Sequence, residues 1–213
     1  MRAIVGMLCA AMLVVAVDAD AKKMYAGVKG GVNMADFGGD DAPGNSSTRT
    51  GFSGGAFYGI DVNDQFGVRG EVNYVQKGAE GDVQAEDGDT HDGTYKLDYV
   101  EIPVLFLANI PAGDKFAFSI FAGPTFAFNT TDEVEIPSHN ETEDLSSIIK
   151  SFEFGAAVGG GIEYMLSSFS IIADVRYSLG ASTVSDDGSG ESIDVKNRGI
   201  GIMAGVRFPL GGK

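Results

Sequence analysis

Residues 199–208, near the end of the chain, alternate strictly between apolar and small or polar positions. The even-numbered positions are Ile, Ile, Ala, Val and Phe, and the odd-numbered ones are Gly, Gly, Met, Gly and Arg. Since successive side chains of a β-strand point to opposite faces, this pattern predicts a strand with one wholly apolar face. Seven further stretches alternate in the same way over about nine to fourteen residues, the length that a tilted membrane strand needs. They lie at 26–34, 52–62, 66–74, 100–108, 116–128, 152–164 and 169–177.

The connections between these stretches alternate in length. Short turns follow the second, fourth and sixth stretches, at 63–65, 111–114 and 166–168. Long segments rich in the loop-forming residues Asp, Gly, Ser, Thr and Asn follow the first, third, fifth and seventh. The sorting predicts an all-β fold: an eight-stranded antiparallel up-and-down transmembrane β-barrel with short periplasmic turns and long extracellular loops.

The net charge of −15 is concentrated in the long connections. Segments 35–50, 77–95, 130–150 and 180–197 contain 19 of the 30 acidic residues and only four of the 15 basic ones. Because nucleic-acid phosphates require Lys and Arg, such loops predict that nucleic acid is not a partner. The loops at 77–95 and 130–150 are candidate contacts for an extracellular protein or ligand; solvation alone would also explain their composition.

Residues 1–21 have the organisation of a secretory signal peptide. A basic residue precedes an apolar run, and Ala19-Asp20-Ala21 fits a cleavage site. A membrane anchor would need about 20 apolar residues, which is longer than this run. Cleavage would remove the only cysteine, Cys9, and leave residues 22–213 as the barrel domain. We therefore expect export through the general secretory route to the outer membrane of a Gram-negative bacterium.

The face opposite the apolar one carries charged residues, which would point into the barrel. Eight strands enclose a space just wide enough for side chains, and isolated buried charges are costly. We therefore expect these charges to pair in a structural plug; a narrow ion or proton path is the alternative. The predicted network comprises Lys29, Arg69, Glu71, Glu101, Glu153, Glu163, Asp174, Arg176 and Arg207.

Aromatic and proline residues add two local expectations. Rings near the strand ends would lie at the two membrane interfaces, among them Tyr25 at the short-turn end and Tyr99 at the long-loop end. Pro103 and Pro124 fall inside predicted strands, where a bulge or a local bend is the usual accommodation of a missing backbone donor.

Four segments of the sequence have motifs that occur together in a known family: Gly27–Asn33, Leu97–Leu105, Phe121–Pro124 and Gly205–Leu210. They resemble the PorT-like, porin-family outer-membrane β-barrel domain, and the similarity extends over about residues 24–210. Tyr-Val-Glu-Ile-Pro, within the second segment, is the most specific part. The resemblance implies an eight-stranded barrel in which both prolines are family features. Outer-membrane lipid and the barrel assembly machinery are the partners expected of such a barrel.

Residues that could carry catalysis or bind a metal are sparse. The two histidines, His91 and His139, lie in predicted loops, and the acidic runs around Asp87 and Asp186 lack the EF-hand spacing. We therefore expect no enzymatic activity, catalytic site, cofactor site or metal site. The sequence predicts a small barrel with a structural or surface-interaction role through its acidic loops. Two alternatives are a narrow channel or transport- or secretion-associated barrel that uses the interior charges, and a soluble lipocalin-like carrier.

Overall fold

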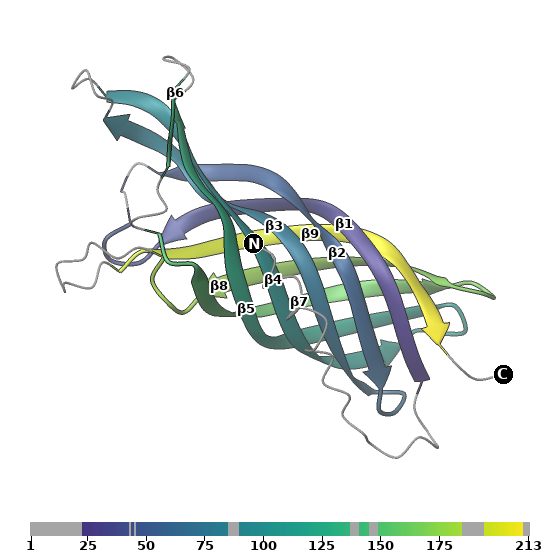
Figure 1. The fold of residues 1–213 in the computed structure, drawn as a ribbon. Coiled ribbons are helices and arrows are strands. Elements are labelled where there is room, and N and C mark those ends of the chain that lie inside the picture. Colours follow the sequence, from purple (N-terminus) through teal and green to yellow (C-terminus); the bar gives the residue numbers. More distant parts are fainter. Residues whose placement is uncertain are drawn as a thin grey trace, which may run out of the picture.

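The computed structural model describes residues 23–42, 44, 46–84, 90–136, 141–144, 149–184 and 194–210, so the predicted signal peptide lies outside the described residues. No helix in these ranges is long and apolar enough to cross a membrane. The described chain forms β-strands (Figure 1). They are β1 (Lys23–Gly38), β2 (Ser47–Asp61), β3 (Phe66–Gln84), β4 (Thr90–Pro111), β5 (Phe116–Ile136), β6 (Glu141–Asp144), β7 (Phe152–Met165), β8 (Ser170–Gly180) and β9 (Lys196–Leu210).

Eight of these strands close into a ring. Neighbours pair antiparallel in the order β1-β2-β3-β4-β5-β7-β8-β9, and β9 pairs back onto β1 from Met24↔Leu210 to Gly38↔Lys196. β6 pairs with β5 and lies outside the ring. Closure leaves the ring without a free sheet edge. The predicted eight-stranded up-and-down barrel is confirmed, with residues 199–208 in its closing strand.

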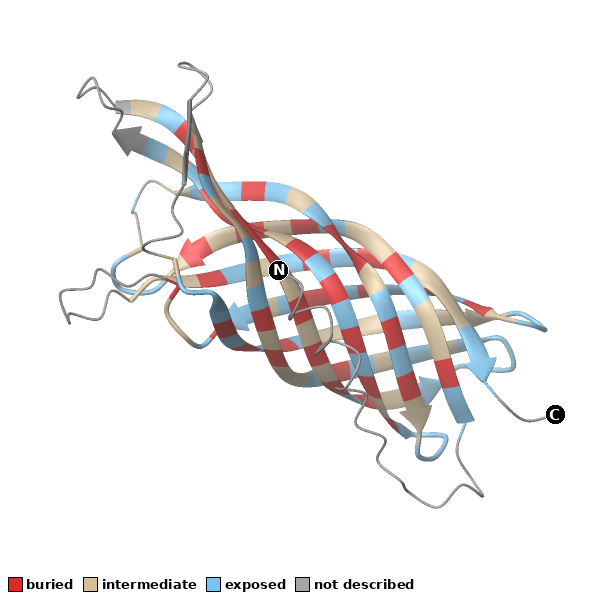
Figure 2. Ribbon diagram, in the orientation of Figure 1, coloured by how far each residue is buried: buried red, intermediate tan, exposed pale blue. Residues whose placement is uncertain are grey.

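Burial alternates along the ring strands, which is visible as bands in Figure 2. On β8, for example, Val175 and Tyr177 are exposed whereas Asp174 and Arg176 are buried. The exposed positions are the apolar ones, as the alternation predicted. An apolar exterior around a charged interior is the arrangement of a barrel whose outer surface contacts lipid.

Two of the predicted long loops are largely β-structure. β3 and β4 remain paired as far as Gln84↔Thr90, and β5 continues to Ile136 and pairs with β6. This extension, residues 79–84, 90–97, 131–136 and 141–144, is called the blade below; it rises beyond the other strands at the upper left of Figure 1. The assignment to loops was therefore wrong at 77–84, 90–95, 130–136 and 141–144, because backbone pairing continues where no lipid imposes an apolar face; residues 85–89, 137–140 and 145–148 lie outside the described residues.

The prolines do not shift the strand register. Pairing between β4 and β5 has the same register on both sides of Pro103 and Pro124. The shift lies between Asp98 and Tyr99, where Thr130 is the extra residue of β5 and its hydroxyl donates to the backbone oxygen of Asp98 at 3.0 Å. The bulge expected at the prolines thus lies at the base of the blade, where it can bend the strand.

Ring closure is sensitive to side-chain volume at Gly205. A Cβ there would lie 2.1 Å from the backbone oxygen of Val28 and 2.7 Å from the Cα of Lys29. We expect Gly205→Ala to cost about 1–3 kcal/mol by overpacking, measured as the free energy of unfolding in detergent. Gly201→Ala is the matched control, because a Cβ there would have its nearest atoms, apart from those of its chain neighbours, 3.8 Å away. Equal destabilisation by the two substitutions would contradict the close approach of β9 to β1.

Candidate functional site

The centre of the barrel contains a carboxylate surrounded by three cations. Glu71 of β3 pairs with Lys29 Nζ at 3.0 Å, Arg69 Nε at 2.8 Å and Arg176 Nη2 at 2.6 Å. The side chains of Lys29 and Glu71 are fully buried. Each residue occupies an inward position of its strand, so the alternation that exposes apolar side chains to lipid also brings these charges together.

Asp174 of β8 is the second acceptor of this group. Its Oδ2 lies 3.0 Å from Lys29 Nζ and 3.5 Å from Arg69 Nη2. The Arg69 guanidinium also lies 5.6 Å from the ring centroid of Phe57 and 5.1 Å from that of Phe121. Cation–π contacts of this kind add to the ion pairs in holding a guanidinium away from bulk water.

Lys77 extends the network toward the blade. Its Nζ lies 2.8 Å from Glu101 and 2.9 Å from Glu153, which are on two other strands. Asn197 donates to Glu153 at 2.5 Å and to the Tyr99 hydroxyl at 3.2 Å. Lys77 was missing from the sequence prediction because it was assigned to a loop, although it continues the inward positions of β3.

The linked central network is electrically balanced. Its two parts meet where Arg176 Nη1 approaches Glu101 at 4.0 Å. A buried charge is tolerated only when its partners replace the lost hydration, so equal numbers of both signs suit a closed interior. The members are the cations Lys29, Arg69, Lys77 and Arg176 and the anions Glu71, Glu101, Glu153 and Asp174.

A separate cluster lies at the short-turn end of the barrel. Arg207 pairs with Glu163 at 2.8 Å and with Asp61, and its guanidinium carbon is 3.6 Å from the ring centroid of Tyr25. These charged side chains keep between 12% and 19% of their surface exposed, so water reaches them. Of the nine predicted network residues, Glu163 and Arg207 thus lie in this mouth cluster, and the other seven lie in the central network.

The structural family follows from this architecture and from the sequence. A family model described as the outer membrane protein beta-barrel domain matches residues 19–185. The chain belongs to this family. It is an outer-membrane β-barrel protein, and its apolar exterior therefore contacts the lipid of that membrane. A comparison with curated proteins finds no significant match.

Solved outer-membrane barrels share the fold at low sequence identity. OprG from Pseudomonas aeruginosa is 15% identical, with 90% of this chain and 98% of that chain covered and a TM-score of 0.55. A major outer membrane protein from Thermus thermophilus is 16% identical, with 86% and 99% covered and a TM-score of 0.52. Neisserial surface protein A is 16% identical, with 88% of this chain and 97% of that chain covered and a TM-score of 0.50.

Aromatic pairs on the exterior mark two levels of this outer-membrane barrel. Phe116 and Tyr164 pair near the short turns, with ring centroids 4.9 Å apart, and Phe128 and Phe152 pair near the blade at 5.4 Å. From Phe116 to Phe128 a strand advances roughly 40 Å, which at a tilt of about 40° spans roughly 30 Å, the thickness of a hydrocarbon core. The blade lies beyond this span.

Two of the rings predicted at the interfaces are instead inside the barrel. Tyr25 and Tyr99 are 2% and 0% exposed. Both occupy inward positions, so placing them against lipid was wrong. Each ring faces a cation: Tyr25 lies against Arg207, and Tyr99 has Lys77 Nζ 4.9 Å from its centroid.

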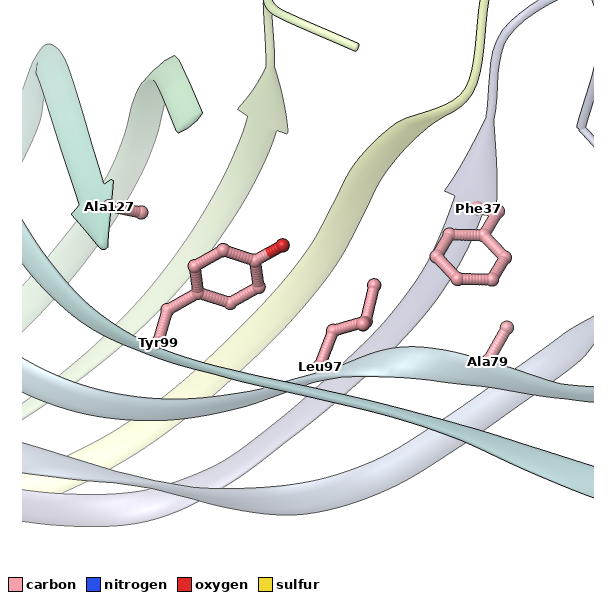
Figure 3. Close-up of a cluster of buried hydrophobic side chains, with 5 residues drawn as sticks. All are labelled: Phe37, Ala79, Leu97, Tyr99 and Ala127. Atoms are coloured by element: carbon pink, nitrogen blue, oxygen red, sulfur yellow. The ribbon is translucent and has the colours of Figure 1, made fainter. Parts of the chain in front are cut away.

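An apolar cluster, drawn in Figure 3, adjoins the central network on the blade side, where its Tyr99 ring lies 4.9 Å from Lys77 Nζ. It was not predicted from the sequence because two of its members, Phe37 and Ala79, fell in predicted loops, although Leu97 had the inward position of its strand. The partly buried side chains of Tyr95, Ile149 and Val195 pack against it. The cluster, called the apolar cap below, consists of Phe37, Ala79, Leu97, Tyr99 and Ala127.

Two small cavities lie in the described interior. The cavity toward the short turns has a volume of about 30 Å³ and is lined by residues that include Tyr25, Arg69 and Asp174. The cavity toward the blade has a volume of about 20 Å³ and is lined by residues that include Lys77 and Glu153. The Tyr25 hydroxyl and Asp174 Oδ1 are buried without a hydrogen-bond partner among the described protein groups. Spaces of this size and polarity suit one or two water molecules.

Beyond the membrane, polar contacts join the ends of β1 and β9. Asp194 donates its backbone N–H to Asp41 Oδ2 at 2.8 Å and accepts from the backbone N–H of Asp40 at 3.3 Å. Hydrogen bonds from Lys196 and from the Asp40 backbone lower the pKa of the Asp194 carboxyl. A lowered pKa means that the folded state favours the carboxylate of Asp194. The contacts that this carboxylate accepts therefore weaken as the pH falls through its pKa in the folded state.

Glu71 should matter most to stability among the interior carboxylates. We expect Glu71→Gln to cost about 3–5 kcal/mol in urea unfolding of the refolded protein, because it leaves three buried cations short of one negative charge. Glu163→Gln is the matched control and should cost much less, since the mouth cluster is partly solvated. Similar losses of unfolding free energy in the two variants would show that burial does not determine how much a carboxylate of the interior contributes to stability.

Proposed function

We propose that this protein is a structural and surface-interaction protein of a Gram-negative outer membrane, in which a sealed barrel anchors the blade outside the cell. The observation that carries the proposal is the combination of a balanced, ion-paired interior with the apolar cap above it. A barrel whose interior is filled by paired charges and an apolar cluster is better suited to anchoring the protein in the membrane than to letting solutes pass. The blade is then the part that is available to partners.

The two alternative functions fit the geometry less well. A channel would need a continuous path, whereas the described interior contains ion pairs and cavities of about 30 and 20 Å³. A soluble carrier would place its apolar side chains inside, whereas Phe106 and Ile120, 61% and 58% exposed, lie outside. We also propose a non-enzymatic role, since the interior charges are occupied with one another.

Export and assembly complete the proposal. Residues 1–21 would direct secretion and be removed, and the barrel assembly machinery would insert residues 22–213. The extracellular partner, a protein or other ligand, would contact segments 77–95 and 130–150, which contain most of the blade. The narrower resemblance to PorT-like proteins stays a prediction, because the family match is to the broader domain.

Conductance separates the sealed barrel from a channel. In planar lipid bilayers the purified protein should give no stepwise current, because ion pairs and the apolar cap block the interior. Reproducible currents that change in Arg69→Ala would contradict the sealed barrel and support an ion path through the central network.

Cysteine labelling of intact cells tests the orientation. The predicted mature chain has no cysteine, so single substitutions can be read without background. Glu80→Cys, on the blade, should react with a membrane-impermeant maleimide, and Asp114→Cys, in a short turn, should react only after the outer membrane is permeabilised. Both side chains are exposed, which makes them a matched pair. The opposite labelling pattern would invert the proposed topology.

A further inference from the structure

The blade is paired differently on its two sides. β7 begins at Phe152, opposite Phe128, and farther along β5 the edge from Glu133 to Ile136 is covered by β6. On the other side β2 begins at Ser47, opposite Glu80, and the next residues of β3, from Gly81 to Gln84, pair only with β4 within the described chain. One freed strand edge is therefore covered by the chain itself, whereas the other has no partner strand among the described residues.

We propose that the β3 edge at Gly81–Gln84 docks an extended, basic polypeptide segment, which adds to the blade as a further strand. The proposal rests on the surface role proposed above and names the partner chemistry. An open edge presents backbone N–H and C=O groups that an extended peptide can pair with. The added strand would lie beside β3 at the position that β2 would occupy if it extended beyond Ser47.

Charge complementarity identifies the occupant as basic. The blade contains nine acidic residues, and Lys96, which pairs with Glu135, is its one lysine or arginine. The Glu80, Asp82 and Asp92 side chains near the edge are exposed. Asp82 and Asp92 are directly opposite each other on β3 and β4, so they place two carboxylates side by side near the edge. Basic side chains on an added strand would be attracted to both.

The same charges disfavour the other occupants of an open edge. A second copy of the blade would bring further carboxylates to the edge, and this repulsion selects against self-association. Lipid is out of reach. Tyr74 aligns through Val100 with Phe128 of the aromatic pair near the blade, and Gly81 lies seven residues farther along β3, roughly 20 Å of extended strand. A basic segment of another protein or peptide is the occupant that satisfies both the edge and the charge.

Two capped, fluorescent octapeptides of equal charge test the proposal on the purified protein in neutral detergent. One alternates Lys with Thr and can extend a sheet; the other has the same four lysines in the order Lys-Lys-Pro-Pro-Lys-Lys-Pro-Pro, so either side of its backbone lacks half of the donors that pairing needs. Fluorescence anisotropy should show the Lys-Thr peptide binding at least tenfold more tightly. Isotope-edited infrared spectra should place its backbone in β-structure when bound. Equal affinities would show electrostatic attraction without strand addition and would overturn the proposal, as would no binding of the Lys-Thr peptide.

Paired variants locate the binding. Asp82→Asn/Asp92→Asn should weaken the Lys-Thr peptide at least tenfold. Asp64→Asn/Asp114→Asn, with the same charge change at the short turns, should leave the affinity unchanged. Equal weakening by both variants would place the interaction elsewhere and overturn the proposal. This result is independent of the cell-labelling experiment, so a correctly oriented surface protein that fails to bind the peptide would contradict the partner assignment alone.

Discussion

Charge pairing in a confined space is the constraint on which the rest of this structure depends. Eight strands leave room for side chains and little else, and a charge in that room is stable only against an opposite charge. Glu71 forms ion pairs with three cations, and Lys77 forms ion pairs with two carboxylates from other strands. These contacts span the ring, so the walls are joined across the interior as well as along the backbone ladder.

The two ends of the barrel are finished in different ways. The short-turn end has a partly hydrated cluster around Arg207, whereas the blade end is closed by the apolar cap around Leu97 and Tyr99. Water can therefore approach the interior from one side more readily than from the other. The difference arises from the strands themselves: β3, β4 and β5 continue past the membrane, and their inward residues meet Phe37 of β1.

Much of this architecture could be predicted from sequence, because a period of two repeated eight times fixes the strands, their faces and the inward charges. The outer ends could not, since beyond the lipid no apolar face marks a strand, and β3 and β4 were ended too early. Lys77 was lost with them. Tyr25 and Tyr99 were misplaced because their position near strand ends was given more weight than their inward alternation. The bulge at Thr130 depends on pairing between two strands, which one strand's sequence does not show.

The unbroken run of β4 and β5 from membrane to blade has a mechanical consequence. Hydrogen bonds of an antiparallel ladder lie across the strands, so a pull along the blade loads many of them together in shear. The lipid-embedded wall and the projecting part form one stiff beam, without a hinge loop between them. Its weakest section is the bulge where Thr130 lacks a cross-strand partner in the ladder. Tension applied to the blade would bend the protein there before it opened the ring.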